Sequence, residues 1–146
     1  MDDETAERII EKADFVKECI AILADYQPMG REEYIADQTA RDVVERRFVK
    51  AIQACIDIAG MILRDEGNAV PDSSAERVRK LTTLGIVPET VGEEIAAAVG
   101  FRNVLAHRYD NDIHHEDVYE SLQNLARFRR YLVAIRDHLD TRGALD

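Results

Sequence analysis

The sequence predicts an all-α protein, an antiparallel bundle of about five helices in one domain spanning residues 1–146. Three observations predict this fold class. Apolar residues recur at spacings of three and four over long stretches, as they do on one face of an α-helix. Only seven glycines and three prolines interrupt the 146 residues, so few points force a long helix to end. Capping patterns and turn residues then divide the chain into helices joined by short connections, as in a bundle.

The first two helices are predicted from long apolar stripes. One stripe covers about residues 3–26 and consists of Ile9, Ala13, Val16, Ile20 and Leu23. Pro28 and Gly30 then break the helix, because proline disfavours helical backbone in the preceding residue and glycine commonly ends helices. The second helix, about residues 31–65, carries two adjacent stripes: Val44, Phe48, Ala51, Cys55, Ile58 and Ile62 in one, and Ile52, Ile56, Ala59 and Leu63 in the other. Such a helix is buried over a wide arc, so we expect it to be central.

Three further helices complete the predicted bundle. Ser73 with Glu76, and Thr90 with Glu93, form capping-box patterns that predict helices over about residues 74–84 and 91–105. Gly85 is a natural stop for the first of them. The last helix, about residues 115–141, keeps one apolar face made of Val118, Leu122, Leu125, Leu132, Ile135 and Leu139.

The composition also bears on the cellular setting. No apolar segment approaches the roughly 20 residues needed to cross a bilayer, so no membrane association is predicted. The chain begins Met-Asp-Asp-Glu, which is acidic where a signal peptide is basic, and we therefore expect a cytoplasmic protein. Cys19 and Cys55 lie on apolar helical stripes, where buried free thiols are expected rather than a disulfide.

The formal net charge is −10 at pH 7. Proteins with broad affinity for nucleic acids are usually basic, so this balance argues against general RNA or DNA binding. An RNA site on this chain would have to be a local cationic patch. Arg127, Arg129 and Arg130, with Phe128, are one candidate for such a patch, and a solvated helix face with salt bridges is the alternative.

The most informative segment surrounds Arg102. Val91, Ile95 and Ala98 step along the fourth helix by four and three, and Arg102 is the next position in that apolar phase. An arginine there is costly unless it is paired or faces a second surface. Asp57, in an otherwise apolar stretch of the second helix, is one candidate partner. A snorkelling side chain or an intrahelical ion pair is the simpler alternative.

His107 lies five residues after Arg102, which on a continuous helix separates the two side chains by about 140°. Either the helix ends near Ala106 and the chain turns His107 back toward Arg102, or a second subunit completes the site. Taken alone, His107 is equally a histidine at a helix end. We predict a symmetric homodimer from the double stripe of the second helix and from Arg102, since a two-fold interface would bring two such sets together.

The segment also carries a family resemblance. Arg102, Asn103, His107 and Tyr109 together match the pattern R-N-x-x-x-H-x-Y, and residues 54–59, Ala-Cys-Ile-Asp-Ile-Ala, match a second-helix signature. On these residues the chain resembles the HepT family of the HEPN superfamily over roughly residues 43–139. The resemblance implies a five-helix bundle that forms a homodimer, with the two motifs facing a cleft at the interface.

The same resemblance implies a function. It implies a metal-independent endoribonuclease that is the toxin of a type VII-like toxin–antitoxin system. The implied partner is an MntA-like nucleotidyltransferase antitoxin, which silences the toxin by transferring AMP to the motif tyrosine, here Tyr109.

The residue types suit RNA cleavage. RNA carries its own nucleophile, the 2′-OH, and a histidine such as His107 can act as general base or acid near neutral pH. Arg102 can stabilise charge on the phosphoryl oxygens through bidentate hydrogen bonds, and Asn103 can orient the phosphate. Tyr109 can stack a base and is also a nucleophile for modification, and an added AMP would block RNA by charge and volume. No metal and no cofactor are expected in this reaction.

Two other functions remain open from the residues alone. One is a catalytically silent HEPN dimer that acts as a binding partner of a nucleotidyltransferase. The other is a structural helical protein without a site. The intact set of Arg102, Asn103 and His107 favours catalysis, because a silent module is expected to have lost at least one of them.

A metal site is a further alternative. Its candidate ligands are His114, His115, Asp110, Asp112 and Glu116. Their spacing follows no standard ligand pattern, so a solvated helix start is the simpler interpretation.

Overall fold

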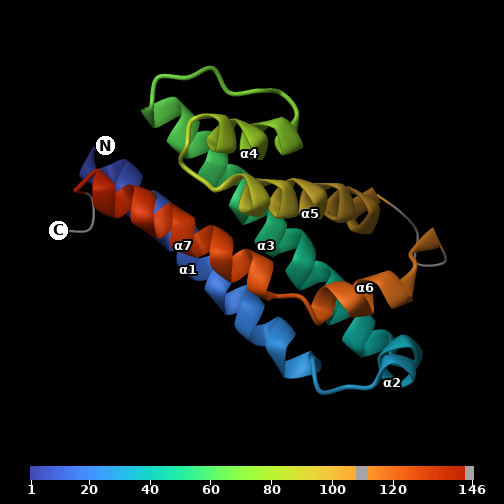
Figure 1. The fold of residues 1–146 in the computed structure, drawn as a ribbon. Coiled ribbons are helices and arrows are strands. Elements are labelled where there is room, and N and C mark those ends of the chain that lie inside the picture. The colour runs from blue at the N-terminus through green and yellow to red at the C-terminus, as the bar shows by residue number, and fades with distance from the viewer. Residues whose placement is uncertain (108–111, 144–146) are drawn as a thin grey trace.

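The computed structural model describes residues 1–107 and 112–143, which contain seven α-helices and no strand (Figure 1). The helices are α1 (Asp3–Tyr26), α2 (Arg31–Ala36), α3 (Gln38–Asp65), α4 (Ser74–Thr83), α5 (Glu89–His107), α6 (His115–Leu122) and α7 (Ala126–Thr141). The all-α class is confirmed. Helices α1, α3 and α5 run in alternating directions, and α7 lies antiparallel along α1 (Figure 1).

Two of the five predicted helices are each divided in the structure. The predicted helix over 31–65 is α2 followed by α3, because Asp37 between them has extended backbone. The Asp37 carboxylate accepts a hydrogen bond from the backbone N–H of Ala40 at 3.0 Å, which caps the start of α3. The predicted helix over 115–141 is α6 followed by α7. At this break Gln123 donates to the carbonyl of Gln27 at 2.9 Å, and Gln27 donates to the carbonyl of Leu122 at 3.0 Å.

Helix α3 is central, as the double stripe predicted. It contacts α1, α4 and α5, and both of its apolar stripes are buried. Tyr131 of α7 reaches it as well, donating its buried hydroxyl to the carbonyl of Cys55 at 2.9 Å. Neighbouring helices of the same chain therefore cover both stripes, so this feature no longer argues for a dimer.

Both cysteines are free and buried, as predicted. Cys19 lies on α1 and Cys55 on α3, and burial raises the pKa of both thiols. A neutral thiol in such a site behaves as a small apolar side chain.

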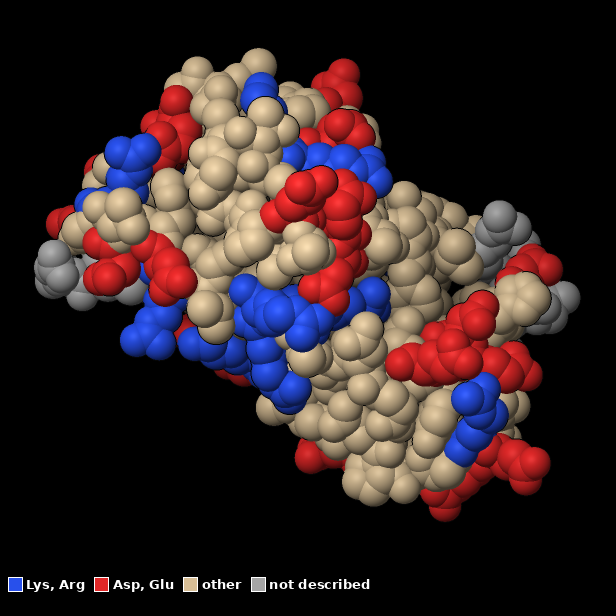
Figure 2. Space-filling model, viewed as in Figure 1, with Lys and Arg blue, Asp and Glu red and all other residues tan. Residues whose placement is uncertain are grey.

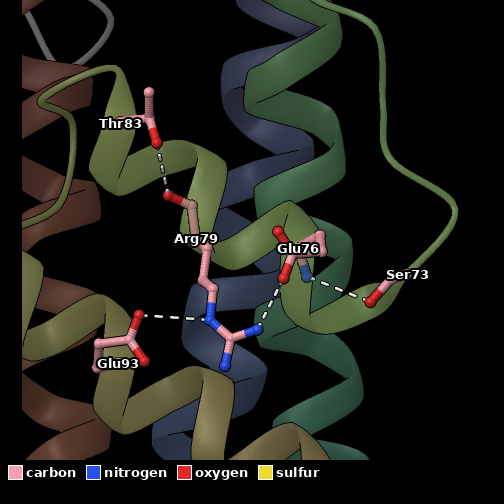
Figure 3. A network of polar contacts seen from close by, with 5 residues as sticks. All are labelled: Ser73, Glu76, Arg79, Thr83 and Glu93. Carbon is pink, nitrogen blue, oxygen red and sulfur yellow. Dashed lines mark hydrogen bonds and ion pairs between the residues drawn. The ribbon is translucent and has the colours of Figure 1, made fainter.

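Helices α4 and α5 are joined by one charged network, which Figure 3 shows. Ser73 caps α4 by accepting from the backbone N–H of Glu76, so this predicted start is confirmed. Arg79 of α4 binds Glu76 at 2.7 Å and reaches across to Glu93 of α5 at 3.3 Å. The predicted cap by Thr90 is wrong, because α5 already begins at Glu89 and its Glu93 pairs with α4.

The two helices also approach closely. Gly92 of α5 faces Thr82 of α4, and a Cβ atom at Gly92 would lie 2.0 Å from the Thr82 hydroxyl oxygen. Only glycine fits at this position without a shift of its neighbour. This contact fixes the first half of α5 against α4.

Candidate functional site

The residues singled out from the sequence lie on the second half of α5. Phe101 and Leu105 face the bundle, with the Phe101 ring edge-on to Phe48 of α3 at 5.3 Å between centroids. Asn103 and His107 are exposed, and Arg102 is half-buried. The apolar positions therefore hold this end of α5 on the core while the polar ones remain accessible.

Helix α5 continues through His107, which is its last residue. The helix end near Ala106 is thus confirmed to within one residue, but His107 is itself helical and does not turn back toward Arg102. On one helix Arg102 and His107 project about 140° apart, whereas Asn103 and His107 are four residues apart and share a face. One chain thus presents an Asn103–His107 pair outward and directs Arg102 toward α3.

Arg102 contacts α3 through a residue that was not predicted. Its Nη1 donates to Oε1 of Gln53 at 3.1 Å. The predicted partner Asp57 is not in direct contact with it; Asp57 instead accepts from Nε2 of Gln53 at 2.9 Å and pairs with Lys12 of α1 at 3.5 Å. Gln53 and Asp57 are four residues apart on α3, and this spacing could have indicated from the sequence that their side chains are in contact.

Arg102 retains donors for a further ligand. Its Nε is buried and has no hydrogen-bond partner among the described residues. A guanidinium has five N–H donors in a planar fork, and only one of them is used on Gln53. Nη2 is neither buried nor hydrogen-bonded to a described residue, so it is the donor that an acceptor such as a phosphate oxygen could reach.

The remaining residues predicted from the sequence are Tyr109 and the candidate metal ligands. Tyr109 and Asp110 are outside the described residues. Of the other candidate metal ligands, Asp112, His114 and Glu116 are exposed, and His115 is half-buried with Nδ1 at 3.8 Å from Glu45. Over residues 1–107 and 112–143 the structure contains no group of three or more side chains suited to a metal ion.

The residues of the candidate basic patch on α7 lie in different environments. Figure 2 shows Lys and Arg side chains gathered over α7 near the middle of one face, beside a group of acidic ones. Arg130 is paired with Glu94 of α5, as the salt-bridge alternative predicted. Arg127 is 9% exposed and lies 5.0 Å from the ring centroid of Phe128, and its burial lowers its pKa. Arg129 and Arg130 are both exposed, and Arg129 forms no ion pair with the described residues.

No helix in the described part of the chain is both long enough and apolar enough to span a bilayer.

Comparison with known proteins relates this helix arrangement to a group of ribonucleases. The chain is 29% identical over 101 residues, 69% of its length and 75% of the relative's, to the mRNA nuclease HepT of Shewanella oneidensis. It is 27% identical over 135 residues, 92% of this chain and 95% of the other, to a putative RNase of Archaeoglobus fulgidus.

A solved structure supports the same relationship. The tri-AMPylated HEPN toxin of Shewanella oneidensis, in complex with an MNT antitoxin, superposes with a TM-score of 0.81 at 25% identity, covering 94% of this chain and 99% of the other. The model of the family "Ribonuclease HepT-like" matches residues 16–135, well over half of the sequence. The resemblance seen in the motif on α5 is therefore confirmed, and the chain belongs to the ribonuclease HepT-like family.

Proposed function

We propose that this protein is a toxin endoribonuclease that cleaves RNA with Arg102, Asn103 and His107. The observation that carries the proposal is the second half of α5, where an anchored arginine with unused donors adjoins an exposed asparagine–histidine pair. The mRNA nuclease activity named for the Shewanella relative supports the substrate class. The proposal places the enzyme in the cytoplasm, in contact with cellular RNA.

The proposed reaction uses the nucleophile that RNA supplies. Neutral His107 takes the proton of the 2′-OH, the 2′-oxygen bonds to phosphorus, and the bond to the 5′-oxygen breaks. The departing 5′-oxygen takes a proton from water, and His107 returns its proton to the solvent, so the products are a 2′,3′-cyclic phosphate and a 5′-hydroxyl. Arg102 donates to the phosphoryl oxygens as their negative charge grows, and Asn103 orients the phosphate. No step requires a divalent metal or a cofactor.

We further propose that the working form is a homodimer. Arg102 and His107 diverge on one helix, so one chain does not direct both toward the same phosphate. The face of α5 next to His107 is apolar and accessible at Ala97, Gly100 and Val104, of which Val104 is 38% exposed. Arg102 points away from that face, toward α3. The proposed two-fold contact therefore sets the side of α5 that carries His107 against the side of the partner's α5 that carries Arg102.

The proposed silencing mechanism is AMP transfer to Tyr109 by a nucleotidyltransferase antitoxin. The tri-AMPylated relative in complex with an MNT antitoxin supports the reaction class and the partner. Tyr109 lies two residues beyond His107, so an AMP group there would bring negative charge and bulk to the place where RNA binds. Mass spectrometry after co-expression with the antitoxin should find the added AMP mass on the peptide that contains Tyr109. Adducts on another residue alone would overturn the assignment.

The cleavage proposal is tested with purified protein and a mixed-sequence RNA in excess EDTA. We expect 2′,3′-cyclic phosphate ends on the products and an undiminished rate. A rate that vanishes in EDTA and returns with magnesium or manganese would refute the metal-independent reaction. If the chain cleaves no RNA under any condition while it still binds the nucleotidyltransferase, the silent binding module is the correct function.

A further inference from the structure

A chain of polar contacts runs from α1 through α3 to Arg102. Lys12 of α1 pairs with Asp57 of α3 at 3.5 Å, Asp57 accepts from Nε2 of Gln53 at 2.9 Å, and Oε1 of Gln53 accepts from Arg102 at 3.1 Å. We propose that Gln53, oriented by Asp57, is a positioning residue that holds the Arg102 guanidinium in place for the RNA phosphate. This inference rests on the proposed ribonuclease function and adds a residue to its site.

The contacts allow only one orientation of the Gln53 amide. An ionised carboxylate only accepts hydrogen bonds and a guanidinium only donates them, whereas an amide has one donor end and one acceptor end. Asp57 therefore takes the NH₂ end, and the carbonyl end must face Arg102. Both Gln53 and Asp57 are half-buried on the rigid helix α3, which limits the movement of the amide.

The absence of charge on Gln53 is as important as its position. A carboxylate in place of Gln53 would also hold Arg102, but it would cancel the positive charge that the phosphate needs. In the observed arrangement the negative charge lies on Asp57, which contacts Gln53 and not Arg102. The ammonium group of Lys12 balances that charge. Among the described residues no carboxylate is in direct contact with Arg102, whose hydrogen-bond partner is the neutral amide of Gln53.

A change at Gln53 should act on the chemical step more than on RNA binding. Arg102 would keep its charge without Gln53, so the phosphate attraction would persist, but the guanidinium would lose its fixed position. Displacement of a catalytic group by about 1 Å can cost about 10²-fold in rate. A merely structural role for Gln53 predicts no such split between cleavage and binding.

The test uses Gln53→Met, Gln53→Glu and a matched control, Gln123→Met. Gln123 also makes an amide contact, to the carbonyl of Gln27 at 2.9 Å, but it lies between α6 and α7, away from the site. For each protein we would measure the single-turnover cleavage rate at saturating RNA. The dissociation constant and its salt dependence would be measured with the same RNA carrying 2′-O-methyl groups, which removes the nucleophile.

The two Gln53 variants should fail in different ways. Gln53→Met should lower the cleavage rate by about 10- to 100-fold, with RNA affinity and salt dependence close to wild type. Gln53→Glu should lower both rate and affinity, with a shallower salt dependence, because one phosphate contact is neutralised. The control should match wild type in both measurements. If Gln53→Met does not fold, Gln53→Ala replaces it, because truncation of a half-buried helix residue to alanine is well tolerated.

The outcomes separate this inference from the function on which it rests. A wild-type protein that cleaves RNA, with Gln53 variants at the wild-type rate, overturns the positioning role and leaves the ribonuclease intact. Equal losses in the Gln53 variants and the control also overturn it, because the effect would then be a general one. A wild-type protein without cleavage overturns the proposed function first, and the positioning role with it.

Discussion

The two halves of α5 differ in how they are held. The first half, through Val99, is held by contacts with two neighbouring helices: Gly92 lies against Thr82, Ile95 and Val99 are buried, and Glu93 and Glu94 pair with arginines of α4 and α7. The second half is attached by Phe101 and Leu105 on one side and leaves Asn103, Val104 and His107 exposed. One helix is therefore a packed support at its start and an accessible polar surface at its end.

The difference teaches how stability and activity are separated in this fold. Dense packing resists any change in side-chain volume, so substitutions in the first half should lower the free energy of unfolding. Exposed polar residues contribute little to that free energy, so substitutions of Asn103 and His107 in the second half should alter the reaction and leave the fold intact. The following predictions test this division, beginning with the largest expected effect.

The largest effect is expected from Arg102→Ala and His107→Ala in the second half. Each removes a group assigned to the chemical step, and general acid–base catalysis alone contributes about 10²–10⁴-fold. We expect RNA cleavage to fall at least about 10²-fold for each variant. For His107→Ala the free energy of unfolding should stay within about 0.5 kcal/mol of wild type, measured by urea unfolding. A large loss of stability in that variant would break the division between the two halves.

The opposite behaviour is expected of Gly92→Ala in the first half. The new Cβ would lie 2.0 Å from the Thr82 hydroxyl, and overpacking of this kind typically costs about 1–3 kcal/mol. Removal of the hydroxyl should relieve the clash, because the next Thr82 atom, its Cβ, lies at 3.4 Å. Gly92→Ala with Thr82→Ala should therefore be more stable than Gly92→Ala alone. Independent, additive effects of the two substitutions in a double-mutant cycle would argue against the contact.

The smallest effect is expected at a histidine outside α5. His138 of α7 is close to Glu66, at 3.2 Å, and burial lowers its pKa from 6.5. The unfolded chain then binds this proton more readily than the folded one, so stability should decrease as pH falls below about 6.5. His138→Gln should weaken this pH dependence between pH 7 and pH 5 in thermal unfolding. Identical pH profiles for wild type and His138→Gln would contradict the assignment.

The fold class could be predicted because helical periodicity and few helix breakers extend along the whole chain. The division at Gln123 could not, since Val118, Leu122, Leu125 and Leu132 continue one apolar face across it. The division at Asp37 lies before the first residue of the apolar stripes, Val44, so the stripes gave no information about it. What ends the helices there is a local cap by Asp37 and a contact between Gln123 and Gln27, which lie far apart in the sequence. A single residue with extended backbone leaves no mark on a pattern read over eleven or more residues.

The site could be predicted only in part, because some of its contacts join residues that are far apart in the sequence. Arg102, Asn103 and His107 fall within one short motif, and the core-phase position of Arg102 correctly indicated that it needs a partner. The identity of that partner, Gln53, depends on how α3 and α5 are packed, 49 residues apart in sequence. The double stripe of α3 was read as a sign of a dimer, whereas the chain's own helices cover it. The geometry of α5 now provides the argument for a second subunit.

The most direct test of this account is complementation between two inactive subunits. Arg102→Ala and His107→Ala chains with different affinity tags would be co-expressed, and the mixed dimer would be purified through both tags. If each site combines His107 of one subunit with Arg102 of the other, the mixed dimer contains one intact site and should regain about half of the wild-type cleavage rate. A mixed dimer as inactive as the two parent variants, or a protein that sediments only as a monomer, would contradict the account.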